Sequence, residues 1–214
     1  MKKTAWILVM LVTSTVAMAQ KGSFYIGGVA GYSSSTHKAP NGNKSGTTSW
    51  AFAPEAGTFL QNDIQLGLSL GLSGSTTTNN GNDTETVSNI SPTVYSRKFF
   101  KLTDNFSTFA GLYLDFISGK TTDHTVTPAQ ESKQSGFGVR LGIGVAYALS
   151  PRFTAVGQYG LLGYQSVNNK VGGNDAGTDS GFNFGVNTVG SSALPFGSGT
   201  VFNVGIYYTF KPAP

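Results

Sequence analysis

The sequence lacks cysteine and contains few charged residues. None of its 214 residues is Cys, and Asp, Glu, Lys and Arg together make up 11% of the chain. The fold therefore cannot depend on disulfide bonds. Average soluble domains contain about 25% charged residues, so this chain has too little charge for a protein whose whole surface faces water. A soluble lipocalin-like barrel is the alternative that this deficit disfavours.

Long apolar runs are also scarce. The longest, Trp6 to Val12, is shorter than the roughly 20 residues of a membrane-spanning helix. It follows Lys2 and Lys3 and precedes the small-residue site Ala17-Met18-Ala19. This order is typical of a secretory signal peptide over residues 1–19, cleaved before Gln20. The mature domain would then cover residues 20–214.

The basic balance of the chain gives no support for a nucleic-acid partner. The formal net charge is +4, and removal of the two lysines in the predicted signal peptide lowers it to +2. The high isoelectric point of the chain is therefore no argument for nucleic-acid binding.

Glycine and strictly alternating apolar residues are abundant instead. The chain has 29 glycines, and from Ile64 to Ser73 Ile or Leu occupies every even position. The segment from Phe137 to Leu149 repeats the alternation. Successive side chains of a strand point to opposite faces, so each segment has one apolar face and one small, polar face. Alternation of this length matches the roughly 9–11 residues of a tilted strand that crosses a bilayer, which predicts a transmembrane β-barrel.

Short and long connections alternate along the chain and indicate eight antiparallel strands. Outer-membrane barrels have short periplasmic turns, long extracellular loops and an even number of strands. The segment from Phe182 to Asn187 is itself strand-like, and would either extend the last hairpin or form the top of a bulged eighth strand. The predicted tight connections are 61–63, 101–105 and 150–152; the long ones are 36–48, 77–85, 119–134 and 167–199. The predicted strands are 23–35, 49–60, 64–76, 86–100, 106–118, 135–149, 153–166 and 200–210.

Aromatic residues gather near both ends of these strands. Belts of aromatic side chains are expected where lipid headgroups meet hydrocarbon. The predicted periplasmic belt contains Phe24, Tyr25, Phe99, Phe100, Phe106, Phe153, Tyr208 and Phe210, and the external belt contains Tyr32, Trp50, Phe52, Phe116, Phe137, Tyr164 and Phe202.

The signal, the glycine-rich alternating strands, the four hairpins and the closing segment from Val204 to Phe210 together resemble a known family. They are similar to the small outer-membrane β-barrel proteins of Gram-negative bacteria, of the OmpA-barrel and OmpX kind. The resemblance implies an up-and-down barrel in the outer membrane, with membrane lipid and the barrel-assembly machinery as partners, and we expect a monomer. Family members usually end on an aromatic residue, whereas here Phe210 is followed by four residues, 211–214.

Four charged residues fall on the inward side of the predicted strands. They are Glu55, Arg97, Asp115 and Arg140, and an Arg that faced lipid at this depth would cost about 2–4 kcal/mol. Buried charges need partners, and these four balance to zero, which predicts a closed ion-pair network across the lumen. Glu55–Arg140 and Arg97–Asp115 are the pairs we expect. The inward set also includes Tyr95, Tyr113 and Gln158.

An eight-stranded barrel has little room beyond its own side chains, so the network would plug and stiffen the barrel. The alternative is a gate, in which a change of ion-pair partners opens a narrow water path.

Signals for catalysis, metal or cofactor binding are weak. The two histidines, His37 and His124, lie far apart, and Asp123 beside His124 has no identifiable nucleophile. Two distant histidines make a poor zinc site. The run from Gly172 to Asp179 could supply oxygen ligands to Ca²⁺, but its residues are also ordinary turn formers. We therefore expect no enzymatic activity, no metal and no cofactor.

Two functions remain from the sequence. The first is a structural or surface-interaction role with a largely plugged lumen, and the alternative is a narrow porin-like channel for ions or small solutes. The sequence identifies no extracellular partner. Leu194-Pro195-Phe196, in the last long connection, is the best contact candidate.

Overall fold

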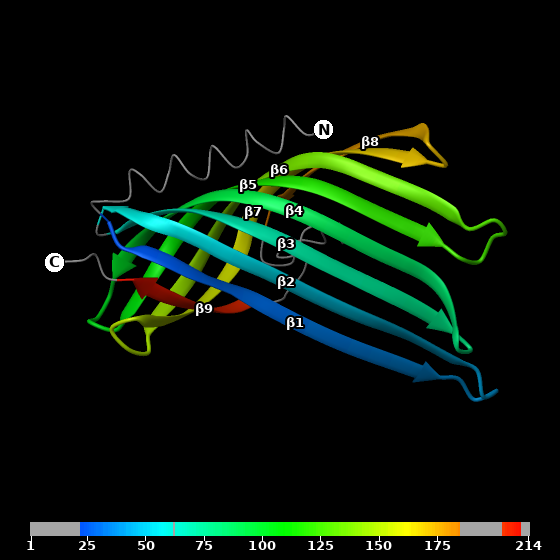
Figure 1. Ribbon diagram of the computed structural model, residues 1–214, viewed down its shortest axis with the longest axis horizontal. Helices are drawn as coiled ribbons and strands as arrows, with labels where there is room; N and C mark the ends of the chain where they lie inside the picture. The colour runs from blue at the N-terminus through cyan, green and yellow to red at the C-terminus, as the bar shows by residue number, and fades with distance from the viewer. Residues whose placement is uncertain (1–21, 62, 185–202, 211–214) are drawn as a thin grey trace.

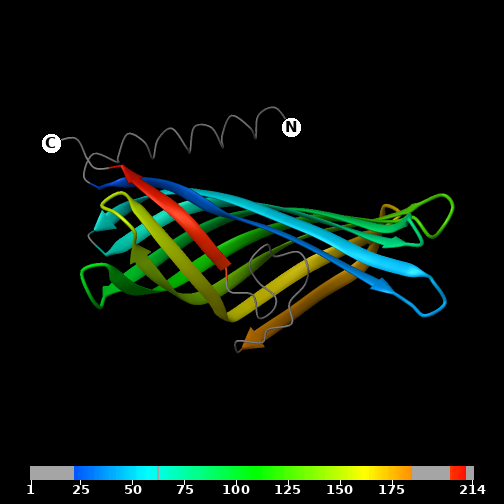
Figure 2. The same cartoon turned by 90° about the horizontal axis from the view of Figure 1, so that it is seen from below.

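The computed structural model describes residues 22–61, 63–184 and 203–210. Within these ranges, nine antiparallel strands run up and down and close into a ring (Figures 1 and 2). The predicted signal peptide and Leu194-Pro195-Phe196 lie outside the described residues. No helix within the described ranges is long and apolar enough to cross a membrane. The strands are β1 (Phe24–Lys38), β2 (Lys44–Gln61), β3 (Ile64–Asn79), β4 (Asn82–Lys101), β5 (Phe106–Asp123), β6 (Gln130–Ala148), β7 (Phe153–Val171), β8 (Asn174–Phe184) and β9 (Asn203–Phe210).

The eighth position of the ring is shared by two strands. β9 pairs with β7 from Phe153 to Gln158 and, on its other edge, with β1. β8 pairs with the opposite half of β7, from Leu162 to Val171. The predicted eight-stranded barrel is therefore confirmed, and Phe182 belongs to the outer part of the eighth position. Residues 185–187 and 200–202, which the sequence also suggests as strand, lie outside the described residues.

Residues that the sequence predicts as long connections continue instead as paired strands. β2 and β4 have 18 and 20 residues, about twice the length needed to cross a bilayer. The added segments are rich in threonine, which favours strands, and directly opposed pairs such as Thr47 and Thr77 continue the sheet. Both of their faces are polar, so the apolar alternation that marks a membrane strand stops while the pairing continues.

Tight turns close two of these long hairpins. Asn80 and Gly81 have φ values of 53° and 85°, and Gly172 and Gly173 have values of 58° and 90°. Two successive left-handed residues are typical of type I′ turns, whose twist fits a two-residue hairpin. The hairpins β3–β4 and β7–β8 therefore project from the barrel as ribbons.

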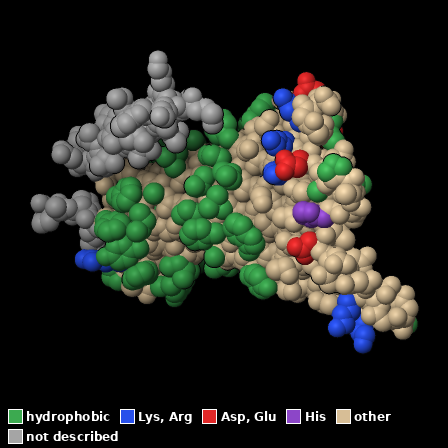
Figure 3. Space-filling model, turned by 45° about the vertical axis from the view of Figure 1, so that its right-hand side comes forward, with side chains coloured by type: hydrophobic (Ala, Val, Ile, Leu, Met, Phe, Trp, Pro, Cys, Tyr) green, Lys and Arg blue, Asp and Glu red, His purple; other side chains and the backbone are tan. Residues whose placement is uncertain are grey.

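The outer surface of the barrel carries the apolar side of the alternation. On β3, Leu66, Leu68 and Leu70 are 41–46% exposed, while the intervening Gln65 and Ser69 are buried in the lumen. On the face shown in Figure 3, hydrophobic side chains gather over one part of the barrel, and a polar zone begins beyond them. Such an apolar band suits lipid contact.

Two predicted members of the periplasmic aromatic belt belong to the interior instead. Tyr25 is fully buried, and Phe99 packs against the interior cluster. Tyr25 lies on the same inward side of its strand as Gly27 and Val29. The alternation of side chains along the strand therefore decides that Tyr25 faces the lumen, although it lies near the strand end.

Among the described residues, the ring is continuous only toward the end with the short turns. β1 pairs with β9 from Phe24 to Gly28, whereas it pairs with β2 along its whole length. Among the described residues, no strand pairs with the other edge of β1 from Val29 to Lys38, and β8 pairs only with β7. The outer parts of β1 and β8 lie well apart in both views (Figures 1 and 2).

Candidate functional site in the barrel lumen

The register of the sheet brings polar residues of neighbouring strands into one inward row. Glu55 lies directly opposite Ser69, Ser69 opposite Thr93, and Thr93 opposite Asp115. Directly opposed residues share a face of the sheet, with their Cβ atoms about 5 Å apart. The row therefore carries two carboxylates with two hydroxyl groups between them.

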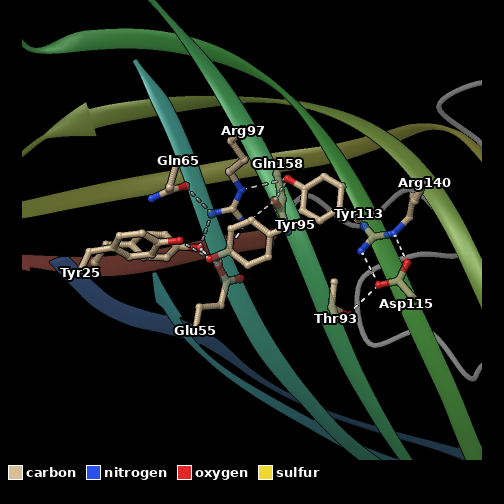
Figure 4. A network of polar contacts seen from close by, with 11 residues as sticks. Tyr25, Glu55, Gln65, Thr93, Tyr95, Arg97, Tyr113, Asp115, Arg140 and Gln158 are labelled. Carbon is tan, nitrogen blue, oxygen red and sulfur yellow. Dashed lines mark hydrogen bonds and ion pairs between the residues drawn. The ribbon is translucent and has the colours of Figure 1, made fainter. Parts of the chain in front are cut away.

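Arg97 occupies the centre of the lumen, where it is 1% exposed. Its Nη2 donates to Glu55 Oε2 at 3.0 Å and to Gln158 Oε1 at 3.3 Å. Its Nη1 donates to Gln65 Oε1 and to the Tyr207 hydroxyl, both at 3.3 Å, and its Nε donates to the Tyr113 hydroxyl at 3.0 Å. A guanidinium has five N–H donors, so these five contacts satisfy Arg97 completely (Figure 4).

Glu55 collects hydroxyl donors as well as the guanidinium. The hydroxyls of Tyr95 and Tyr207 donate to its Oε2 at 2.7 and 2.8 Å. Because the single proton of Tyr95 is used in this bond, the Tyr25 hydroxyl donates to Tyr95, over 2.7 Å. Charge-assisted hydrogen bonds of this kind offset the cost of taking the carboxylate out of water.

A second ion pair lies beside the first (Figure 4). Arg140 donates through Nε to Asp115 Oδ2 at 3.0 Å and through Nη2 to Oδ1 at 3.2 Å, and the Thr93 hydroxyl donates to Oδ1 at 2.7 Å. The Arg140 guanidinium also lies 4.5 Å from the centre of the Tyr113 ring. Tyr113 accepts from Arg97 with its hydroxyl, so this one residue contacts both ion pairs.

The four charged residues predicted to face the lumen all lie there, but their pairing differs from the prediction. Glu55 pairs with Arg97, and Asp115 pairs with Arg140. The register explains the exchange. Asp115 lies opposite Gly138 and Arg140 lies opposite Tyr113, so Asp115 and Arg140 are diagonal neighbours on adjacent strands, within reach of a long side chain. Strand alternation gives the face of a residue but not its register with the next strand.

The network includes residues that the sequence analysis did not select. Tyr95, Tyr113 and Gln158 belong to it as expected. Strand alternation alone could have identified the inward residues that the sequence analysis missed. Each of them lies an even number of positions from a residue predicted to face inward or from an inward glycine, and therefore on the same face of its strand. They are Tyr25, Gln65, Thr93 and Tyr207.

Between the ion pairs and the end of the barrel with the short turns, an arc of aromatic rings fills the lumen. The ring centres of Tyr25 and Phe59 are 5.8 Å apart, those of Phe59 and Phe99 5.9 Å, and those of Phe99 and Phe109 5.2 Å. Gly67 makes room for this packing, because a Cβ there would lie 2.6 Å from Tyr95 Cζ and would also collide with the Tyr25 hydroxyl. Rings and ion pairs together fill the lumen over this half of the barrel.

The polar filling becomes sparser toward the long hairpins. The Gln134 amide donates to Asn89 Oδ1 at 3.3 Å, and the Asn89 amide donates to Ser73 Oγ at 3.5 Å. Gly119, on the strand between them, leaves space for both amides. Ser69 Oγ is buried without a hydrogen-bond partner among the described residues.

The other candidate residues lie apart from this network. The exposed His124 contacts the Thr86 hydroxyl through Nε2 at 3.2 Å, and His37 lies opposite Ser45 near the tip of the β1–β2 hairpin. The run from Gly172 to Asp179 forms the β7–β8 turn and the start of β8. Within the described ranges, no group of three or more His, Asp or Glu residues is placed to hold a metal ion.

A closed antiparallel barrel with an apolar outer band and a polar, filled lumen defines the class of transmembrane β-barrels. The sequence model of the outer membrane protein beta-barrel domain matches residues 4–210, and the chain belongs to this family. It is therefore a protein of the Gram-negative outer membrane. A comparison with curated protein sequences gives no match.

Several solved structures of outer-membrane proteins are similar to this chain. Neisserial surface protein A (NspA) is 15% identical with a TM-score of 0.45, over 87% of this chain and 97% of NspA. The translocator domain of the autotransporter NalP from Neisseria meningitidis is 11% identical with a TM-score of 0.46, over 85% of this chain and 66% of that chain. A major outer membrane protein from Thermus thermophilus is 17% identical with a TM-score of 0.44, over 88% of this chain and 99% of that chain.

Proposed function

We propose that the protein is a non-conducting outer-membrane barrel that anchors polar β-hairpins outside the membrane, with a structural or surface-interaction role. The Arg97 network carries this proposal. Its members come from β1, β2, β3, β4, β5, β7 and β9, and Arg140 of β6 packs on Tyr113, so every position around the ring contributes a side chain at this level. A water path would have to break several charge-assisted hydrogen bonds at once.

The long hairpins support the surface part of the proposal. β2, β4 and β6 each extend well past the length needed to cross hydrocarbon, so the chain devotes many residues to paired ribbons that contact no lipid core. Paired strands hold their side chains in fixed positions more firmly than irregular loops would.

Single-channel recording of the refolded mature protein in a planar bilayer tests the plugged lumen. A heat-dependent shift on a gel first confirms folding. The wild-type protein should show no discrete openings, whereas the double variant E55A/R97A should conduct, because the two side chains at the centre of the lumen are lost. Discrete openings of the wild-type protein would instead support the narrow-channel alternative.

A control variant with the same change in charge separates the lumen from the rim. Lys98 follows Arg97 directly, points to the outside and pairs with Asp63 at the periplasmic rim, where both side chains are more than 40% exposed. D63A/K98A therefore removes one exposed ion pair, between the β2–β3 turn and β4, without touching the lumen, and the variant should not conduct. Equal conductance of both double variants would show that the plug does not lie at Arg97.

A further inference from the structure

Three lysines form a row across the outer wall of the long hairpins. Lys120 on β5 lies directly opposite Lys133 on β6, and Lys133 lies directly opposite Lys170 on β7. All three belong to the outward side of their strands, the side that carries Phe116 and Phe137 lower down. Like charges directly opposite one another destabilise a sheet, so an anionic partner is needed to favour this arrangement.

Acidic side chains of the chain itself neutralise only the two outer lysines. Lys120 pairs with Glu131, and Lys170 pairs with Asp175 at 3.6 Å. No carboxylate within the described residues lies within ion-pair distance of Lys133, between them. The row therefore keeps a net positive charge of one, at its centre.

The position of the row relative to the membrane identifies the partner. The three lysines lie four residues beyond Phe116, Phe137 and Ser166, about 13 Å further along the strands. Phe116 and Phe137 are 55% and 50% exposed and end the apolar band. With the usual strand tilt, the backbone of the row stands roughly 10 Å above the hydrocarbon edge, just beyond a headgroup layer about 5–8 Å thick. The long lysine side chains can extend back into this layer. Figure 3 shows a polar zone beyond the hydrophobic side chains on the face that it presents.

A hollow next to the row offers room for a headgroup. It has a volume of about 840 Å³ and lies between the β5–β6 loop and the β7–β8 turn. Lys133 and Lys170 line it together with the Lys120-paired Glu131 and with the apolar side chains of Val126 and Pro128. Cationic groups beside an apolar wall suit a phosphate carried on a bulky, partly apolar group.

We propose that Lys120, Lys133 and Lys170 form a binding surface for the phosphate groups of outer-leaflet lipid headgroups, with Lys133 as the principal cation. The net positive charge of the row, centred on Lys133, attracts the phosphates that the membrane presents at this level. This surface is independent of whether the lumen conducts. It would fix the rotational position of the barrel in the leaflet and order the lipid next to β5, β6 and β7.

Lipid retention by the refolded mature protein tests the proposal. Native mass spectrometry in detergent would compare bisphosphorylated lipid A with the same lipid after removal of its phosphates. The intact lipid should remain bound more tightly, and inorganic phosphate at the same concentration should not displace it, because the acyl chains help to hold it. Equal binding of the two lipids, or displacement by inorganic phosphate, would overturn the proposal.

Two single variants with opposite expected effects sharpen this test. K133Q should weaken binding about fivefold, the usual effect of one lysine at an anionic membrane surface. E131Q should strengthen binding, since it frees Lys120 from its ion pair. The matched control is K44Q, which removes another exposed lysine, opposite Lys38 at the tip of another hairpin, and should leave binding unchanged. Equal binding by K133Q and K44Q would also overturn the proposal.

Discussion

The two halves of this barrel use the same strands in opposite ways. Near the short turns, the ring is closed by β9 and the lumen is filled by rings and ion pairs around Arg97. Toward the long hairpins, the described part of β1 loses its second partner beyond Gly28, and the ribbons carry hydroxyl and amide side chains on both faces. Stability is therefore concentrated in one half, while the other half is free to present side chains.

The contrast teaches what each half requires from its sequence. In the closed half, each inward position must match its neighbours in size and hydrogen bonding, because an unpaired buried polar group is costly. In the projecting half, a position needs only strand propensity and a suitable turn. Substitutions of the same kind should consequently have very different effects in the two halves.

The largest expected effect comes from Arg97→Met. This change leaves the Glu55 carboxylate buried without its cation, and breaking a buried pair from one side typically costs about 3–5 kcal/mol. The free energy of unfolding, from urea titration of the barrel in lipid vesicles, should fall by that amount. The double variant E55Q/R97M should recover part of the loss, because no charge is then left unpaired.

An ion pair of the projecting half provides the comparison for Arg97. Lys120→Met breaks the pair with Glu131 on the exposed hairpin wall, where water and salt screen the charges. Its urea midpoint should match that of the wild-type protein. Equal losses for Arg97→Met and Lys120→Met would contradict the assignment of stability to the closed half.

Two glycines on inward positions give the next largest contrast. Gly67→Ala places a Cβ against the Tyr25 hydroxyl and the Tyr95 ring, and overpacking of this kind costs about 1–3 kcal/mol. Gly31→Ala, also inward but in the outer half of β1, meets no atom within 4 Å. Urea titration should show a loss for Gly67→Ala only. A similar loss at Gly31 would show that the outer half is also tightly packed.

The sequence predicts the closed half of the barrel better than the projecting half. The alternation from Ile64 to Ser73 predicts a membrane strand because lipid and lumen impose opposite chemistry on its two faces. The same rule correctly brings Arg97 and Asp115 inward. It fails for the projecting ribbons, because water on both faces imposes no alternation, and threonine-rich strands then resemble loops. It also fails for the ion-pair partners, since register depends on strand pairing that no local pattern encodes.

A shortened β3–β4 hairpin would test whether the barrel folds independently of the hairpins that project from it. Deletion of residues 77–79 and 82–85 keeps the Asn80-Gly81 turn and joins it to Thr76 and Thr86, which already face each other. The removed residues lie beyond the apolar band, so the variant should still show the heat-dependent gel shift and a nearly unchanged urea midpoint. Failure to fold would mean that the projecting half contributes to the stability of the barrel.

The smallest effect concerns the charge on Glu131. The hydrogen bond from Lys120 lowers the pKa of Glu131 below its ordinary value of 4.5, and the charge of Lys133 acts in the same direction. Because the pKa is lower in the folded state, the pair stabilises the hairpin above pH 4.5, and this contribution is lost as the pH falls through the lowered pKa. Carboxyl NMR titration in micelles should show the pKa of Glu131 returning toward 4.5 in Lys120→Gln and rising less in Lys133→Gln. The reverse order would mean that Lys133, rather than Lys120, is the partner of Glu131, and Lys133 would then no longer be the free cation at the centre of the lysine row.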